Sequence, residues 1–410
     1  MEGSWKYKLW KRLTKSLVYS ADERKLFFDN MWHVRMIQQQ AGEAFKGNSS
    51  PECIVAVQGT HYSGSSAVLG LLQEFDGVGV TGFLQPTWTK SNPGIQQSEC
   101  CFFIASGFPE LIRAFHQGSP EEVDLSIKRF IQNTNRAYKN KGFRSGEFMP
   151  LLYGSTFKRI THEYLHKILE LDDYTRGVLK ERDFPHAAWE DDDPVWDGCT
   201  FAFGKGKGRY LNYRFAQLSG TQFREATAGY LREFFSILRG RRVLVFDQLL
   251  RYDYLELINQ YMDSPIKQIC VFRDPRDSYL SALRMDVNEQ PGSVADYKAY
   301  HLGRRNEFRN NYPHRLIIRF EDLVLNYEDI CQKIIDFIGL KSSDHKAKKS
   351  VFDPRISVSN IGAYRHYLRP EFMQQLENEM KDCCFDPTNE SLSEEALELL
   401  KSSGNWNDIL

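Results

Sequence analysis

The stretch Gly59–Ser66 has residue types and a spacing suited to binding an anion. Its sequence is Gly-Thr-His-Tyr-Ser-Gly-Ser-Ser, the frame of a phosphate-binding loop in which Ser65 replaces the usual lysine. Glycines let backbone N–H groups converge on an anion, a following helix N-terminus adds partial positive charge, and serine hydroxyls add donors. Because the missing lysine normally reaches the β- and γ-phosphates, we expect a phosphate or sulfate-like group to bind without nucleoside-triphosphate hydrolysis. The alternative is a turn that only connects a strand to a helix.

A second candidate anion site is Arg273-Asp-Pro-Arg-Asp-Ser-Tyr-Leu-Ser281, directly after the apolar run Ile269–Phe272. Ligands of open α/β sheets bind where strands end. Asp277 is predicted to cap the following helix, and Ser281 falls about one turn into it. Arg273 and Ser281 would then converge on one anion, with the guanidinium as a bidentate donor. The alternative is a surface network of ion pairs among the arginines and aspartates of this motif.

The elements around these two motifs alternate between strands and helices. Short apolar runs rich in β-branched residues, typical of buried strands, occur at 53–57, 243–246, 269–272 and 316–320. Apolar residues at helical spacing follow Gly59–Ser66 and the later runs. This alternation predicts an α/β fold with a P-loop-like parallel sheet covered by helices. Helical periodicity dominates in the interval between the first strand unit and the others, which predicts a large, mostly helical insertion.

The length of 410 residues allows two domains or one enlarged α/β core. The motif order favours one core, because both candidate anion sites belong to the same alternating pattern. We expect an N-terminal helical segment at 1–50, a core from 51–90 and 240–385, the insertion at 91–239, and a C-terminal tail at 386–410 that forms a surface helix.

Composition limits the classes of partner and compartment. With 53 basic and 54 acidic residues the net charge is -1, which excludes a generally basic nucleic-acid binder and leaves room for a local positive pocket. The eight cysteines show no CxxC spacing, so reduced thiols are expected. The chain shows no apolar run of about 20 residues and no signal peptide, which predicts a cytoplasmic protein. Residues 5–17 are amphipathic and basic, and would pack on the protein or make weak contact with a membrane surface.

Together these motifs resemble the sulfotransferase family that uses 3'-phosphoadenosine 5'-phosphosulfate (PAPS), in particular its bacterial, carbohydrate-type members. Gly59–Ser66 is similar to the family's 5'-phosphosulfate loop, and Arg273 with Ser281 is similar to its 3'-phosphate motif. The segment 319–340 resembles the family's "EDL…FLGL" sequence, and 357–367 resembles the late loop that closes over the nucleotide. The resemblance covers roughly residues 51–85 and 240–375.

The resemblance implies that PAPS is the co-substrate, that no metal is needed, and that the sulfuryl group goes to an acceptor hydroxyl. The insertion would shape the acceptor site. Carbohydrate is the favoured acceptor because Trp88, Trp189 and Trp196 would stack on sugar rings, unless they belong to the core. The nucleotide-binding residues that it implies are Gly59, Thr60, His61, Tyr62, Ser63, Gly64, Ser65, Ser66, Arg273, Ser281, Tyr364 and Arg365.

Tyr62 departs from the family pattern, which usually has arginine or lysine just before the Ser-Gly pair. In the family that cation stabilises charge on the sulfuryl group and on the leaving oxygen. Either a neighbouring cation replaces it, with His61 or the basic residues of 205–209 as candidates, or catalysis is lost and the protein is an inactive PAPS- or nucleotide-binding module.

Transfer to a hydroxyl also benefits from a general base. Asp247 directly follows the run Val243–Phe246 and would face the ligand edge of the sheet; its alternative roles are a helix cap or an ion pair with Arg251. His61 and Glu74 are the other candidates. We take His61 and Asp247 as the predicted catalytic residues.

One motif favours a different chemistry. His162-Glu163-Tyr-Leu-His166 matches H-E-x-x-H on a segment with helical periodicity, the first half of a zinc metallohydrolase site. Lys167 follows at once and no G-x-x-H continuation appears. A zinc hydrolase is therefore the less favoured alternative, and a solvated amphipathic helix is the expected role of this segment.

Overall fold

The computed structural model describes residues 49–60, 62–81, 106–119, 159–161, 163–171, 200–203, 209–215, 220–251, 254–284, 293–308, 312–367 and 370–408, with short stretches between 103 and 130. The predicted amphipathic segment 5–17, His61, and the tryptophans Trp88, Trp189 and Trp196 lie outside these residues. None of the described helices is long and apolar enough to cross a membrane.

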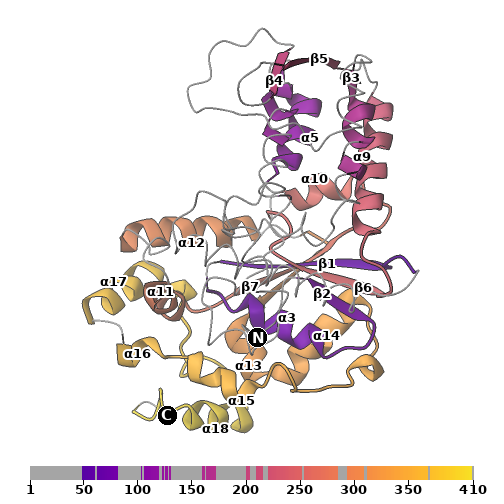
Figure 1. Cartoon of the computed structure of the whole chain (residues 1–410). Coiled ribbons are helices and arrows are strands. Elements are labelled where there is room, and N and C mark those ends of the chain that lie inside the picture. The colour runs from indigo at the N-terminus through magenta and orange to yellow at the C-terminus, as the bar shows by residue number, and fades with distance from the viewer. Residues whose placement is uncertain are drawn as a thin grey trace, which may run out of the picture.

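A five-stranded parallel sheet forms the centre of the fold, with strand order β2-β6-β1-β7-β8 (Figure 1). This confirms the predicted α/β class. Val57 lies opposite Asp247 and Gly59 opposite Val271, so the carboxyl ends of β6, β1 and β7 share one edge. The strands are β1 (Cys53–Gly59), β2 (Val78–Thr81), β6 (Val243–Asp247), β7 (Lys267–Phe272) and β8 (Arg315–Arg319).

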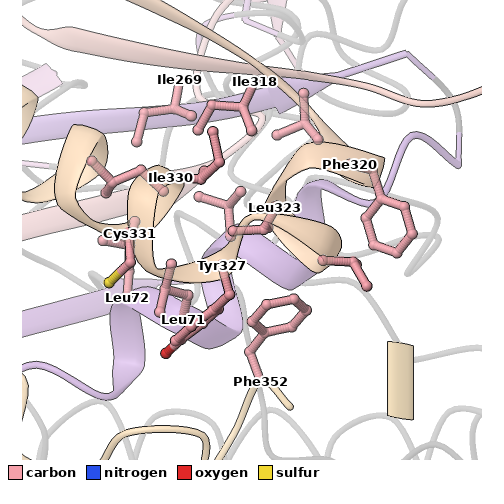
Figure 2. Close-up of a cluster of buried hydrophobic side chains, with 14 of the residues drawn as sticks. Leu71, Leu72, Ile269, Ile318, Phe320, Leu323, Tyr327, Ile330, Cys331 and Phe352 are labelled. Atoms are coloured by element: carbon pink, nitrogen blue, oxygen red, sulfur yellow. The ribbon is translucent and has the colours of Figure 1, made fainter. Parts of the chain in front are cut away.

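Both faces of the sheet are covered by helices because its central strands are apolar on both sides. Side chains on one face of β1 and β6 join a core with α5 (Phe108–Gln117), α9 (Gly220–Phe235) and α10 (Leu255–Asn259). Those on the other face pack on α3 (Ser65–Gln73), α13 (Phe320–Leu325) and α14 (Tyr327–Ile338). Figure 2 shows this second core, where Leu71 and Leu72 of α3 approach Ile330 and Cys331 of α14.

Further helices follow β7 along the chain, in addition to α13 and α14. They are α11 (Pro275–Arg284), α12 (Val294–Phe308), α15 (Pro354–Ser357), α16 (Tyr364–Tyr367), α17 (Pro370–Met380) and α18 (Glu394–Ser402). A third, smaller core joins α11, α12, α16 and α17.

The insertion holds more than helices. Alongside α5 it contains an antiparallel sheet of β3 (Leu169–Leu171), β5 (Arg209–Phe215) and β4 (Thr200–Phe203), in the order β3-β5-β4. The sequence pattern did not predict these strands. Strand β3 has only three residues, too short for an alternating pattern to be recognised.

The C-terminal segment packs into the second core. Ser393 begins α18 by accepting the Ala396 N–H at 3.2 Å, and Ala396, Leu400 and Trp406 are buried. The expected surface helix is therefore one wall of the core. The apolar positions at i and i+4 carried this information, but the surrounding glutamates and serines concealed it.

The helix α3 is anchored at the end remote from the Gly59–Ser66 loop. Glu74, directly after α3, accepts the backbone N–H groups of Lys349, Val351 and Phe352 at 2.9 to 3.0 Å and lies 2.7 Å from His345 Nε2. This buried carboxylate joins α3 to the chain after α14. Its position at the far end of the helix leaves Glu74 no part in chemistry at the loop.

Removing this anchor should destabilise the protein. Glu74→Gln keeps the shape but turns an amide N–H₂ toward backbone donors, so we expect the free energy of unfolding to fall by about 2 to 4 kcal/mol. Urea denaturation measures it. The control Glu328→Gln alters an exposed carboxylate 3.5 Å from Lys348 and should change stability by less than about 0.5 kcal/mol. Equal losses in the two variants would contradict the anchoring role.

Candidate active site

The loop after β1 folds back over the end of its own strand. A Cβ atom on Gly59 would lie 1.9 Å from Ser63 Oγ and 3.0 Å from the Val271 carbonyl oxygen, so only glycine allows this turn. Ser63 N–H donates to the Thr60 carbonyl at 3.0 Å, and Gly64 at φ 86 begins α3. The turn therefore directs the N-terminus of α3 to the edge where the parallel strands end.

Two hydroxyl groups of this loop are buried without partners. Thr60 and Ser63 are 3% and 1% exposed, and neither Oγ atom has a hydrogen-bond partner among the residues that the structure describes. An unsatisfied buried hydroxyl costs about 1 to 3 kcal/mol, so such groups need an explanation. Among the residues that the structure describes, no side chain caps α3, and the first turn of this helix has no acidic residue. Hydroxyl donors at an uncapped helix N-terminus are suited to an anionic ligand.

Arg273 joins this loop to two other segments. It directly follows β7, is 7% exposed, and donates from Nη1 to the Tyr62 carbonyl at 3.3 Å and to Ser281 Oγ at 3.2 Å. Its Nη2 donates to the Asn360 carbonyl at 2.5 Å. The predicted pairing of Arg273 with Ser281 is present in the structure, and the loop, α11 and the late loop meet at this guanidinium.

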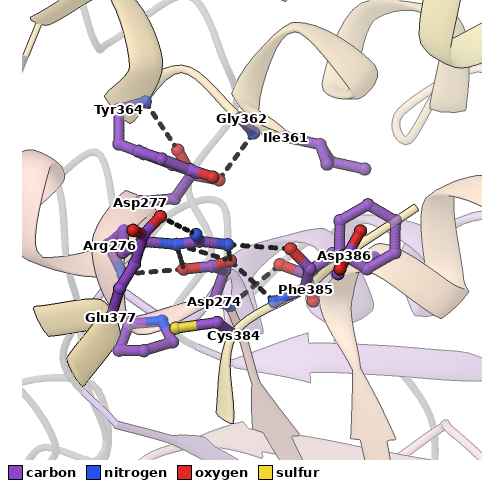
Figure 3. A network of polar contacts seen from close by, with 12 residues as sticks. Asp274, Arg276, Asp277, Ile361, Gly362, Tyr364, Glu377, Cys384, Phe385 and Asp386 are labelled. Atoms are coloured by element: carbon purple, nitrogen blue, oxygen red, sulfur yellow. Dashed lines mark hydrogen bonds and ion pairs between the residues drawn. The ribbon is translucent and has the colours of Figure 1, made fainter. Parts of the chain in front are cut away.

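The start of α11 differs from the prediction. The helix begins at Pro275, and Asp274 just before it accepts the Arg276 N–H at 2.8 Å. Asp277 lies in the first turn and is fully buried; its carboxylate accepts the N–H groups of Gly362 at 2.8 Å and Tyr364 at 3.0 Å (Figure 3). The predicted cap at Asp277 is therefore wrong, because Asp274 caps the helix and Asp277 holds the late loop. Burial raises the pKa of Asp277 to about 6.

Ion pairs also occur in this motif, but in the interior. The Arg276 guanidinium lies 2.6 Å from Asp274, donates to the Phe385 carbonyl at 2.7 Å and stacks on the Tyr364 ring at 4.1 Å (Figure 3). The ion-pair network that the sequence offered as an alternative is therefore present around Arg276, but it is buried and not on the surface. Arg273, not Arg276, contacts the loop.

Glu321 belongs to the same buried cluster of charged groups. Apart from its place in the segment 319–323, nothing in the sequence indicated that it would lie at the candidate site. Its Oε1 accepts the Asp274 N–H at 2.8 Å, and its Oε2 has no partner among the described residues. Burial and, secondarily, the charge of Asp274 raise the pKa of Glu321 to about 8, while Arg273 opposes this shift. This carboxyl group is therefore mostly protonated at neutral pH.

Asp247 lies at the end of β6, beside β1 and at the same edge as the loop. The next residue, Gln248, has φ 52 and donates its N–H to the Val57 carbonyl at 3.0 Å. Tyr62 has φ 60, so two non-glycine residues in the left-handed region follow neighbouring strand ends. Such conformations cluster at functional sites. The strand-end position expected for Asp247 is present; its catalytic role stays a prediction.

The late-loop residues are held by protein groups. Tyr364 is buried, and burial raises its pKa above the ordinary tyrosine value. Arg365 pairs with Asp408 at 2.5 Å and lies 4.9 Å from the Trp406 ring centroid. Sequence reasoning did not foresee the C-terminal partners, which lie about 40 positions further along the chain.

The H-E-x-x-H segment makes ordinary surface contacts where it is described. Glu163 accepts two bonds from Arg159 at 2.8 Å, and both side chains are exposed. His162 lies outside the described residues. Within the described part of the chain, no group of three histidine, cysteine or acidic side chains is arranged to hold a metal ion.

No protein-family model matches the chain, and no curated protein matches it in sequence. The solved structures that are similar to it include the following three. The sulfotransferase domain of the Synechococcus PCC 7002 olefin synthase is 12% identical, with 88% of this chain and 97% of that chain covered and a TM-score of 0.34. A sulfotransferase from Mycobacterium avium is 12% identical, with 90% of this chain and 86% of that chain covered and a TM-score of 0.32. The sulfotransferase domain of the curacin biosynthetic pathway is 13% identical, with 87% of this chain and 98% of that chain covered and a TM-score of 0.28. Identities and TM-scores this low assign no activity to the chain.

Protonation of Glu321 should make stability depend on pH. The unfolded carboxyl ionises near 4.5, whereas the folded one keeps its proton up to about pH 8. The folded state therefore binds more protons between these values, and its stability falls as the pH rises through them. Glu321→Gln cannot ionise but still accepts the Asp274 N–H, so its melting temperature should fall less than the wild type's between about pH 5 and about pH 8. Calorimetry measures both profiles; identical slopes would show that Glu321 is ionised in the fold.

Proposed function

We propose that the protein is a sulfotransferase that transfers the sulfuryl group of PAPS to an acceptor hydroxyl. The observation that carries this proposal is the contact of Arg273 with both Ser281 and the Tyr62 carbonyl, which joins two candidate anion sites at one edge of the sheet. A ligand with two separate anionic groups matches such a pair of sites. PAPS has this chemistry and, when bound, supplies the activated sulfuryl group.

The residues present fit the two ends of this nucleotide. The unpartnered hydroxyls of Thr60 and Ser63, at the N-terminus of α3, suit the phosphosulfate. The Arg273 guanidinium and Ser281 Oγ suit the 3'-phosphate; Arg273 Nε is buried without a partner among the described residues and has a hydrogen to donate. Tyr364 and Arg365 stay candidates for further nucleotide contacts.

In the proposed reaction the acceptor oxygen forms a bond to sulfur while the bond from sulfur to the phosphate oxygen breaks. We assign Asp247 the role of general base, which takes the proton of the acceptor hydroxyl. The loop hydroxyls and the N-terminus of α3 stabilise the negative charge that develops on the leaving phosphate. His61 stays a second candidate for proton transfer or charge stabilisation. We retain carbohydrate as the proposed acceptor class on the resemblance alone.

Tyr62 favours a second candidate function, a nucleotide-binding module without catalysis. The loop Gly59–Ser66 contains no arginine or lysine, and the residue before Ser63 offers Arg273 a carbonyl oxygen. Incubation with labelled PAPS and a panel of hydroxyl acceptors separates the two functions. Protection from thermal unfolding by the nucleotide without any transfer would favour the module.

Nucleotide binding should depend on Arg273. Arg273→Ala removes a buried guanidinium assigned to the 3'-phosphate, so the Kd for adenosine 3',5'-bisphosphate should rise by about 100-fold. Isothermal titration calorimetry measures this. The control Arg355→Ala removes an arginine that is 77% exposed and paired with Asp353, and it should leave the Kd unchanged. A wild-type protein that does not bind this nucleotide would refute the proposed function.

Turnover should depend on Asp247 while nucleotide affinity does not. With an acceptor found in the panel, Asp247→Asn should lower kcat by about 10²- to 10⁴-fold, the usual contribution of a general base. Its Kd for adenosine 3',5'-bisphosphate should stay within about twofold. The matched control Asp263→Asn changes an exposed aspartate paired with Arg232 and should keep full activity. Undiminished turnover in Asp247→Asn would assign the base elsewhere.

A further inference from the structure

Donors from two distant segments bind three consecutive carbonyl groups of the late loop. The carbonyl oxygens of Ser359 and Ile361 accept bonds from Asn405 Nδ2 at 3.1 and 2.8 Å. Between them, the Asn360 carbonyl accepts the bond from Arg273 Nη2. The peptide groups that face Arg273 are therefore held by the C-terminal segment as well.

The neighbouring residues of the loop are fixed in the same way. Trp406 Nε1 donates to the Ile361 carbonyl at 3.2 Å. Gly362 has φ 78, and a Cβ atom there would lie 2.5 Å from Trp406 Nε1, so glycine permits both the backbone turn and the contact with the indole. The N–H groups of Gly362 and Tyr364 bind Asp277 (Figure 3).

Burial makes these contacts effective. Asn405 is 8% exposed and Trp406 is 3% exposed, and Ile361, whose carbonyl both side chains bind, is buried, so water does not compete freely for this carbonyl. Ser359 and Asn360 are exposed. The Ile361 carbonyl would have to reorient or stay unsatisfied if it lost these donors. The only other donor to this stretch of carbonyls that the structure records among the described residues is Arg273.

We propose that Asn405, assisted by Trp406, is a positioning residue for nucleotide binding. By holding the carbonyls of Ser359 and Ile361, Asn405 keeps the Asn360 carbonyl turned to Arg273 and thereby fixes the guanidinium. This inference rests on the proposed function, in which Arg273 binds the 3'-phosphate. A guanidinium that is already oriented loses less conformational entropy when it binds an anion, which increases affinity.

The same segment also restrains Arg365. Its guanidinium lies over the Trp406 ring and pairs with Asp408, so the residues 405–408 contact the late loop on both sides of Gly362. Of the two late-loop residues that we assign to the nucleotide, Arg365 is thus restrained by the C-terminal segment, whereas Tyr364 is held by Asp277 and Arg276 of α11.

The test compares two asparagines of one segment. Asn405→Ala removes the amide that binds the loop, whereas Asn407→Ala changes an exposed side chain two positions away. We expect the Kd for adenosine 3',5'-bisphosphate to rise by about tenfold in Asn405→Ala, because the Arg273 guanidinium is no longer held in its binding orientation, and to stay unchanged in Asn407→Ala. With PAPS, KM should rise while kcat at saturation stays at the wild-type value, since positioning of the nucleotide alone is lost.

A purely structural role would instead lower the free energy of unfolding and leave the Kd of the folded protein unchanged, which would overturn the inference. If Asn405→Ala does not fold, the variant Trp406→Phe tests the inference instead. This variant keeps an aromatic ring beside Gly362 but loses the hydrogen bond to the Ile361 carbonyl, so the Kd should rise by about threefold. An unchanged Kd there also overturns the inference. Wild-type protein that does not bind the nucleotide refutes the proposed function itself, whereas normal wild-type binding with unaffected variants refutes only the role of Asn405.

Discussion

The burial of the Arg273 guanidinium at the carboxyl edge of the sheet is the constraint on which the rest of the site depends. A buried cation must be paired and hydrogen-bonded, or its desolvation makes the fold unfavourable. Four acidic groups lie around Arg273 and Arg276: Asp274, Asp277, Glu321 and Glu377, the last of which pairs with Arg276 at 2.6 Å. Burial and the charge of Asp274 raise the pKa of Glu321 to about 8. A protonated Glu321 reduces the negative charge that faces the two guanidinium groups.

The polar bonds of this cluster also explain why segments far apart in the chain meet. Asp277 binds amides 85 and 87 positions later, and Asp274 binds the Phe385 amide 111 positions later. Each bond satisfies a buried carboxylate with the backbone of another segment, so α11 cannot form its first turn without fixing the late loop and the chain before α18. The parallel sheet supplies the edge, and the buried carboxylates determine which loops gather there.

The parts of this arrangement that the sequence could predict are those encoded by local patterns. Buried strands appear as β-branched runs, and the loop after β1 appears as a glycine and serine spacing. The contact of Arg273 with Ser281 spans eight positions, across one strand end and about the first two turns of α11. The predicted cap at Asp277 was wrong because Asp274 and Asp277 are both suited to cap a helix. Pro275 favours the first position of a helix, so the helix begins there and Asp274 is the cap. The roles of Glu74, Glu321 and Asn405 depend on partners 44 to 278 positions away, and no local pattern signals such a partner.

The two halves of the candidate site differ in the kind of charge that they offer an anion. The half at Arg273 provides a full positive charge held by Ser281, Asn360 and the Phe320 ring. The half at Gly59–Ser66 provides neutral hydroxyls, backbone amides and the partial charge of a helix N-terminus, with no arginine or lysine of its own. A full charge strengthens binding of the ground state, whereas catalysis requires stabilisation of charge that develops only in the transition state. Under the proposed function, binding and transfer therefore depend on different halves of the site, and the neutral half is the one that distinguishes an enzyme from a binding module.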